Sequence, residues 1–490
     1  MLKRSVIVVK ENEIKIIKTD ADSKNGQNKC PKCGATDISL NVKTGKLRCN
    51  FCRHQFELEK FETMEQNIEN LEGEIIGSGA SDIIDNSNND IVTLKCTSCG
   101  AEVVVDTLTK TQARCHWCRN TLSINEQIPN GAVPDTVLPF SITKNEAKKA
   151  IENFVNKRKF YAHPQFKKEF SLDNVMGVYL PYMIVDANVH SNLSGQGEVE
   201  TRRWTEKEGD SYKTYYDADL YDVERKFDLT IEGLTVESSK DKLEQSGKNK
   251  TNNIINSIMP FDTENCVKWD ANFIKGYTSE KRDVNIESLK PLVNEQFKDI
   301  ARYSANKTLE QYNRGVRWDN EQLNIKGRQW KSAYLPVWIY SYLEKKGNEH
   351  LLHYVAVNAR TKETMGSVPI HKPKLILMSL IVEFFGLIAA LLSYYKISNE
   401  DSWYPWLFLL SGIIYYFIIY GKYRNTGARH QHEIETKCKM SNLQNTDRFV
   451  KKRRRLDKST MDGANNKKVS GTLKNNNILN KTIDDMKNNL

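Results

Sequence analysis

Eight of the ten cysteines in this chain form four Cys-x-x-Cys pairs. They fall into two groups, with fifteen residues between the two pairs of each group. The groups are Cys30, Cys33, Cys49 and Cys52, followed by Cys96, Cys99, Cys115 and Cys118. Two thiolates separated by two residues can face one ion, and two such pairs complete a tetrahedral four-sulfur site. The spacing therefore predicts two structural Zn²⁺ ions, with iron in a rubredoxin-like site as the lesser alternative.

Sites of this kind offer no catalytic chemistry. Four thiolates leave no coordination position open for water, so the metal supplies neither a Lewis acid nor an activated nucleophile. His54 and His116 stand next to predicted ligands. We expect them to face solvent or to contact the ligands from outside, because four sulfurs already complete each site.

The rest of the chain holds no familiar catalytic motif. A phosphate-binding loop, His-Glu-x-x-His, Gly-x-Ser-x-Gly and Gly-x-Gly-x-x-Gly are all missing from the sequence. Cys266 stands alone and is better explained as a small buried hydrophobe than as a nucleophile. We therefore expect no enzyme and assign no catalytic residue. An enzyme in residues 132–369 stays open as a third class, because a missing motif does not exclude an activity.

Small β-structures must position the cysteines. In the first group, the pattern predicts a hairpin of residues 38–42 and 46–48 that turns at Gly45. In the second group, it predicts a hairpin of residues 103–105 and 112–114. We expect zinc ribbons at 28–58 and 92–125. An N-terminal extension, 1–27, precedes the first ribbon. Residues 59–91 are rich in Gly, Ser and Asn at their end, which is typical of a linker.

An internal repeat follows the ribbons. Val137-Leu-Pro-Phe140 is echoed by Ile258-Met-Pro-Phe261, and Tyr179-Leu-Pro181 is echoed by Tyr334-Leu-Pro336 in the same order. Apolar residues at helical spacing predict a helix after each Pro-Phe motif, and alternating patterns then predict strands. We expect residues 132–370 to be an α+β region with two related halves.

Two apolar stretches near the C-terminus depart from the otherwise polar composition. Residues 375–395 and 403–420 are each close to the roughly 20 apolar residues that a spanning helix needs. Lys372 and Lys374 precede the first stretch and Lys422 follows the second, so the positive-inside rule places both termini in the cytosol. No secretory signal is seen at the N-terminus. These features predict a two-span protein of the cell membrane.

Glu383 lies inside the first predicted span, where an ionisable group needs a partner. Two explanations are open. It marks an interface with another membrane protein, or it is protonated and hydrogen-bonds Ser411 or a backbone carbonyl of the second helix.

The excess of positive charge lies in the tail. Residues 1–120 hold 17 Lys or Arg and 17 Asp or Glu, whereas residues 421–490 hold 17 and 7. The ribbons therefore have no strong electrostatic attraction for nucleic acid. We expect 421–490 to be a basic, largely disordered cytosolic tail. Its densest run, which is expected to bind anionic lipid or an acidic partner, is Lys451, Lys452, Arg453, Arg454 and Arg455.

The chain as a whole is expected to be multidomain: two N-terminal zinc ribbons of small β type, an α+β repeat region, a two-helix transmembrane hairpin and a disordered tail. This arrangement resembles a bacterial group described as TFIIB-type zinc-ribbon-containing membrane proteins. It is most similar to the member that works with phage-shock protein A homologues and SPFH-type proteins. The resemblance implies a scaffold at the envelope. Labels such as primosomal helicase or phage replisome organiser, used for similar sequences, have no nucleotide-binding residues to support them here.

Two functions compete. The first is a non-catalytic zinc-binding membrane scaffold that recruits partner proteins in an envelope-stress response. Its expected partners are the lipid bilayer and a phage-shock protein A homologue, an SPFH-type protein or another small membrane protein. The second is a membrane-tethered nucleic-acid-binding protein associated with replication or transcription. The neutral charge of the ribbons favours the first.

Overall fold

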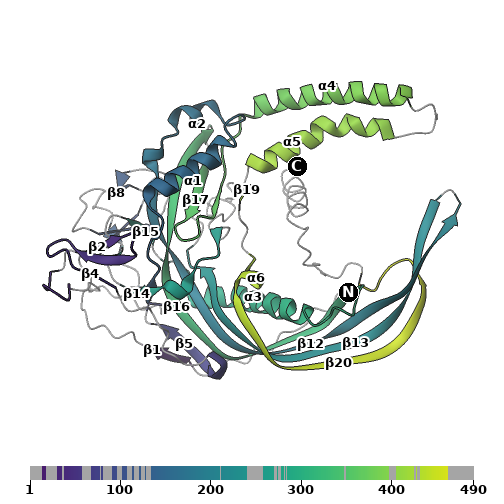
Figure 1. Ribbon diagram of the computed structural model, residues 1–490, viewed down its shortest axis with the longest axis horizontal. Helices are drawn as coiled ribbons and strands as arrows, with labels where there is room; N and C mark the ends of the chain where they lie inside the picture. Colours follow the sequence, from purple (N-terminus) through teal and green to yellow (C-terminus); the bar gives the residue numbers. More distant parts are fainter. Residues whose placement is uncertain are drawn as a thin grey trace.

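The structure is a computed structural model. It describes residues 14–17, 30–35, 38–57, 68–77, 79–80, 91–95, 102–106, 113–114, 121–122, 127–128, 134–209, 211–239, 258–269, 273, 277–280, 282, 284–346, 349–396, 404–423, 426–427 and 431–461. It contains a small N-terminal sheet, a large curled sheet, and helices on and beside that sheet (Figure 1).

Two long antiparallel strands form the centre of the large sheet. They are β12 (Met176–Glu208) and β16 (Val316–Lys346), and Leu180 lies opposite Leu335, so the two Leu-Pro motifs face each other. A return strand flanks each of them: β13 (Ser211–Glu237) pairs with β12, and β17 (Glu349–Asn358) pairs with β16. The order β13-β12-β16-β17 is therefore symmetric about its centre.

In each half, one helix of more than ten residues precedes the long strand. α1 (Lys144–Asn156) is capped by Thr143 and Glu146 and buries one face in a core cluster that includes Trp338 and Val357. α3 (Ile286–Asn306) packs into a second cluster with residues of β12 and β13 such as Phe227. Both halves thus share the order helix, long strand and return strand.

A curved arm extends from the sheet and is the longest projection in Figure 1. It consists of β12, β13, part of β16 and a late strand, β20 (Lys437–Leu456), which pairs with β13 from Tyr216 to Glu232. The expectation of a largely disordered tail is therefore wrong for β20. Composition missed this strand because its partner is more than 200 residues away, and the partner strand supplies the hydrogen bonds that a polar segment needs to be ordered.

The expected linker also contains part of the sheet. β5 (Gly73–Gly77) runs parallel to β16 and is flanked on its other side by β1 (Ile14–Ile17), which lies in the N-terminal extension. The linker prediction is therefore wrong for β5. A Cβ atom at Gly327 would collide with the backbone of Leu71, so a residue without a side chain allows the chain before β5 to approach β16.

The first predicted ribbon contains a three-stranded sheet of β2 (Ile38–Asn41), β3 (Lys46–Cys49) and β4 (Gln55–Phe56). The predicted hairpin between β2 and β3 is confirmed, with Gly45 at positive φ in its turn. Ile38 and Leu47 are fully buried in the same core cluster as α1. The ribbon therefore packs on the α+β region.

The second predicted ribbon is paired differently from the expected hairpin. β7 (Glu102–Asp106) pairs with β6 (Ile91–Lys95) and β15 (Thr278–Glu280), whereas β8 (Ala113–Arg114) pairs with β9 (Thr121–Leu122). The expected pairing of 103–105 with 112–114 is thus wrong, because β15 and β6 occupy both edges of β7.

The two apolar stretches form a helical hairpin. It lies at the top of Figure 1, whereas the strands of the arm lie at the bottom. α4 (Lys372–Lys396) is followed by a 3-10 turn, Tyr404–Leu410, and by α5 (Ser411–Tyr423). Two segments of it, Lys372–Tyr395 and Trp406–Tyr423, are long and apolar enough to cross a membrane. The remaining short elements are α2 (Pro164–Glu169), α6 (His432–Glu435), β10 (Gln127–Ile128), β11 (Thr136–Val137), β14 (Val267–Lys268), β18 (Thr364–Gly366) and β19 (Thr426–Gly427).

Candidate metal centre

The first four cysteines converge on one point. Their sulfur atoms all lie within 4.8 Å of one another. The Cys30 and Cys52 sulfurs are 3.5 Å apart, and those of Cys33 and Cys49 are 3.6 Å apart. Zn–S bonds of about 2.3 Å place the corners of a tetrahedron about 3.8 Å apart. The cluster therefore has the composition and approximate size of a four-thiolate metal site.

Two turns of the same shape present the sulfurs. The Gly34 N–H donates to the Cys30 carbonyl at 2.8 Å, and the Arg53 N–H donates to the Cys49 carbonyl at 2.9 Å. Gly34 and Arg53 both have positive φ, 72° and 61°. Glycine suits this conformation, and Arg53 adopts it at some cost because the turn is needed to direct both sulfurs to one side.

The protonation of the cluster favours a bound cation. Burial opposes ionisation of Cys30, but backbone N–H groups of Cys33 and Lys32 donate to its sulfur and lower its pKa to about 7. The Ala35 N–H favours the Cys33 thiolate, but burial and the neighbouring sulfurs raise its pKa to about 12. Four negative sulfurs cannot share this space without a compensating positive charge, and a divalent metal ion supplies it.

His54 does not belong to the ligand set. Its ring stacks on Phe56, with 6.2 Å between ring centres. Cys30 and Cys49 are buried, Cys52 is half-buried and Cys33 is exposed, so the cluster lies at the edge of the ribbon. Cys96, Cys99, Cys115, Cys118 and His116 lie outside the described residues. The structure thus describes one candidate metal site of the two that were predicted.

Cys266 is a core residue. It is 4% exposed, and burial raises its pKa to about 12. A thiol with this pKa is not ionised near neutral pH, so the geometry favours a buried hydrophobe over a nucleophile.

Glu383 is bonded within the hairpin. The backbone N–H of Gly412 in α5 donates to its carboxyl oxygen at 2.6 Å. A Cβ atom at Gly412 would lie 2.5 Å from the Ser379 carbonyl oxygen, so the two helices approach closely at this point. Of the two explanations, the structure favours a bond to the second helix, but its partner is the Gly412 N–H, which donates to Glu383, rather than Ser411 or a backbone carbonyl.

The basic run of the tail lies on β20 and is partly neutralised. Lys451, Lys452 and Arg454 are exposed. Arg453 forms an ion pair with the fully buried Glu198, and Arg455 pairs with Glu206 at 3.0 Å. The five residues therefore do not act as one free cationic patch.

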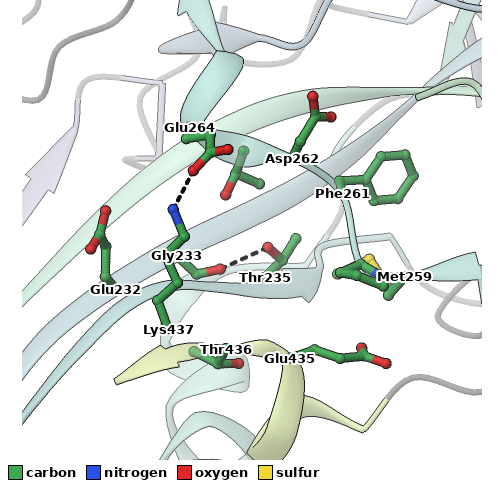
Figure 2. Close-up of a pocket in the computed structure, with 12 residues that line it drawn as sticks. Glu232, Gly233, Thr235, Met259, Phe261, Asp262, Glu264, Glu435, Thr436 and Lys437 are labelled. Carbon is green, nitrogen blue, oxygen red and sulfur yellow. Dashed lines mark hydrogen bonds and ion pairs between the residues drawn. The ribbon is translucent and has the colours of Figure 1, made fainter. Parts of the chain in front are cut away.

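A hollow of about 120 Å³ lies between the start of β20 and residues 259–264 (Figure 2). Two of its acidic residues are already paired: Asp262 with Arg360 at 2.5 Å, and Glu264 with Lys437. Sites for small organic ligands usually enclose about 300 Å³ or more. We assign no ligand to this hollow.

Sequence reasoning missed a buried charge cluster around Glu74 of β5. Its carboxylate accepts from Arg328 at 2.7 Å, from the Trp330 indole at 2.8 Å and from Lys290 at 3.0 Å. Burial alone would raise the pKa of Glu74, but Arg328 and Lys290 hold it below its usual value. Nothing in a polar segment that reads as a linker could have indicated this cluster.

Comparison with known proteins gives one informative similarity. The chain is 24% identical over 346 residues to the uncharacterized protein YdjG of Bacillus subtilis strain 168. The aligned part covers 71% of this chain and 91% of YdjG. No protein-family model and no solved structure gives a significant match. The similarity extends well beyond the cysteine pairs, but the name of this relative states no activity.

Proposed function

We propose that this protein is a non-catalytic, zinc-binding scaffold of the cell membrane that recruits cytosolic or membrane partner proteins. The observation that supports this most is the direct attachment of an apolar helical hairpin to a folded sheet that carries a closed four-thiolate site. Such a site leaves no position for substrate, and the hairpin gives the sheet a fixed place at a membrane.

The exposure of the hairpin supports insertion in a bilayer. Leu380, Phe384 and Phe385 of α4 are each at least 60% exposed. A helix in the core of a soluble protein would bury such residues, and an unpartnered surface of this size is unfavourable in water. Lipid acyl chains are the partner that fits, and the flanking lysines favour a topology with both termini in the cytosol.

The arm supports a role in recruitment. It carries β20 at its edge, and the exposed side chains of this strand include Leu443, Phe449 and Val450. Edge strands and exposed apolar side chains are common contact points for other proteins. The resemblance given under Sequence analysis suggests the partners: a phage-shock protein A homologue, an SPFH-type protein or another small membrane protein, in an envelope-stress response.

The exposed lysines of β20 favour one alternative, a membrane-tethered nucleic-acid-binding protein. Acidic residues of β13 oppose them, however: Asp219 lies opposite Lys452, and Asp222 lies opposite Arg448. Together with the ion pairs of Arg453 and Arg455, these carboxylates reduce the field that phosphate binding requires.

The test is purification of the tagged full-length chain from detergent-solubilised membranes of its native host, followed by identification of the bound proteins. We expect partner proteins that contact the first predicted ribbon to be retained by the wild type and by Cys438→Ser, and to be lost with Cys49→Ser. Binding of DNA or RNA with a steep salt dependence, and no retained protein, would replace the scaffold with the alternative.

A further inference from the structure

The corner between α1 and α2 lies against the base of the helical hairpin (Figure 1). Phe160 at this corner is 55% exposed, and the Lys374 ammonium of α4 lies 3.7 Å from the centre of its ring. An exposed aromatic ring beside the first turn of a spanning helix is suited to the interface between water and acyl chains. The corner is therefore positioned at the surface of the bilayer.

Hydrogen bonds to both ends of the hairpin fix the corner in place. The His371 N–H donates to the Tyr161 carbonyl at 2.8 Å, and the Tyr161 N–H donates to the Tyr423 hydroxyl at 3.1 Å. The Arg158 guanidinium also donates to the Lys422 carbonyl at 3.1 Å. Because these bonds reach the start of α4 and the end of α5, the corner keeps a constant depth relative to the spans.

Three lysines gather at this corner. Lys374 and Lys167 both donate to the carbonyl oxygen of Phe160, at 2.9 Å and 3.5 Å. Lys159 is exposed one residue before Phe160. Burial lowers the pKa of Lys167, and the positive charges of Lys374 and Lys159 lower it further.

These lysines have no anionic partner among the residues that the structure describes. Within the described ranges, no carboxylate forms an ion pair with Lys159, Lys167 or Lys374. Like charges held this close repel one another unless an anion lies between them. The position of the corner makes the phosphate of a membrane lipid the nearest source of that anion.

We propose that Lys159, Lys167 and Lys374 bind the phosphate of an anionic phospholipid in the leaflet where the hairpin enters, while the Phe160 ring rests among the glycerol groups of neighbouring lipids. This proposal rests on the membrane insertion proposed above. It moves the main lipid contact from the tail run at Lys451–Arg455, which the sequence indicated, to the α1–α2 corner.

The test measures binding of a fluorescent short-chain phosphatidylglycerol to the detergent-solubilised full-length chain by anisotropy. The variant Lys159→Gln/Lys167→Gln/Lys374→Gln is compared with the control Lys451→Gln/Lys452→Gln/Arg454→Gln, which loses the same charge from exposed positions on β20. Each basic residue near a membrane surface contributes a factor of about five. We expect roughly a hundredfold weaker binding in the corner variant and little change in the control.

Further measurements distinguish lipid binding from a folding defect and from binding of a free anion. Replacing the three corner lysines by arginine should restore binding, which shows that a folding defect is not the cause. Phosphatidylcholine and soluble glycerol phosphate should compete poorly with the fluorescent phosphatidylglycerol. Effective competition by glycerol phosphate, without any acyl chain, would mean that the lysines form a site for a free anion and would overturn the lipid assignment. Equal binding by the corner variant and the wild type would also overturn it. Carbonate extraction of membranes that hold the wild-type chain tests membrane insertion separately. Release of the chain by carbonate would refute membrane insertion itself.

Discussion

At the scale of single residues, the first four cysteines and Glu74 show two ways in which a fold brings ionisable side chains together. The cysteines are close in sequence, and two matching turns bring their sulfurs together. Glu74 and Arg328 are separated by 254 positions and meet only because β5 pairs with β16. Both clusters are expected to contribute to stability, and each can be tested by removing one member.

Replacing Cys49 by serine should abolish metal binding at the first site, because a hydroxyl is a poor substitute for a thiolate ligand. Metal analysis of the purified chain by mass spectrometry should show one bound zinc fewer than in the wild type. Cys438→Ser is the matched control, since Cys438 lies on β20, away from the cluster, and should leave the zinc content unchanged. Equal zinc content in Cys49→Ser and wild type would refute the site.

Replacing Glu74 by alanine should lower the free energy of unfolding by about 3–5 kcal/mol, because it removes the buried carboxylate that Arg328 and Lys290 share. Lys290 still pairs with Glu287 in this variant. Urea unfolding of the solubilised chain measures the change. Glu72→Ala, two positions away at an exposed site, should change the stability by less than about 0.5 kcal/mol. A small effect of Glu74→Ala would mean that water already solvates the cluster.

The same carboxylate predicts a pH dependence. The pKa of Glu74 is lower in the folded chain than in the unfolded chain, where it is about 4.3. Its stabilisation is therefore complete above that value and is lost as the pH falls through and below it. Unfolding measured from neutral pH to about pH 3 should show a smaller loss in Glu74→Ala than in wild type. Parallel curves for the two proteins would contradict the assignment.

At the scale of elements, β20 returns to the sheet after the helical hairpin and completes the arm. Arg225 of β13 is fully buried, and its guanidinium pairs with Asp447 of β20 at 2.6 Å and 3.2 Å. The start of the arm is thereby tied to a strand that follows the two apolar helices in the chain. The tail is part of the fold as far as the described residues extend.

Asp447→Ala should destabilise the arm by about 3 kcal/mol, because Arg225 would keep its charge in a buried position without its carboxylate. Hydrogen exchange should then be faster in β20 and along its partner β13, with the rest of the sheet little affected. Asp457→Ala, at an exposed position beyond the strand, is the control and should exchange like the wild type. Unchanged protection of β20 in Asp447→Ala would show that the ion pair is dispensable.

The helical hairpin offers a second test at this scale. Glu383→Gln keeps an oxygen that can accept from the Gly412 N–H, so the pairing of α4 and α5 should be retained. Glu383→Leu leaves that N–H without an acceptor and should weaken the pairing by about 1–2 kcal/mol. Thermal unfolding in detergent compares the two variants. Equal loss in both would indicate that the charge of Glu383, rather than its hydrogen bond, is what matters.

At the scale of the whole molecule, the metal site, the sheet and the hairpin are joined through one core. Ile38 and Leu47 of the first ribbon share a buried cluster with α1, and Leu375 at the start of α4 belongs to the same cluster. A change at the metal site can therefore reach the base of the hairpin through packed side chains. The arm belongs to a different cluster, formed around α3.

Removal of metal by a chelator should consequently have a regional effect. We expect hydrogen exchange to increase in residues 38–56 and in the neighbouring α1, whereas the arm strands β12 and β13 keep their protection. Re-addition of zinc should reverse the change. Loss of protection throughout the sheet would mean that the ribbon is required for the entire fold, and no change anywhere would mean that it folds without metal.

The sequence by itself determined those features that depend on neighbours along the chain. Cysteine spacing was enough to predict the first cluster of four cysteines, and length and apolarity were enough to predict two helices able to cross a membrane. Helical periodicity likewise indicated α1 and α3.

Only the tertiary structure decided the features that depend on distant partners. β5 lies in a stretch that was predicted to be a linker, and β20 is a polar segment that was predicted to be a disordered tail. Each becomes a strand because a long strand far away in sequence satisfies its backbone. The Glu74 cluster and the lysines around Phe160 are also assembled from separate elements. Periodicity reports which face of an element is apolar, but it carries no information about which distant element will meet that face.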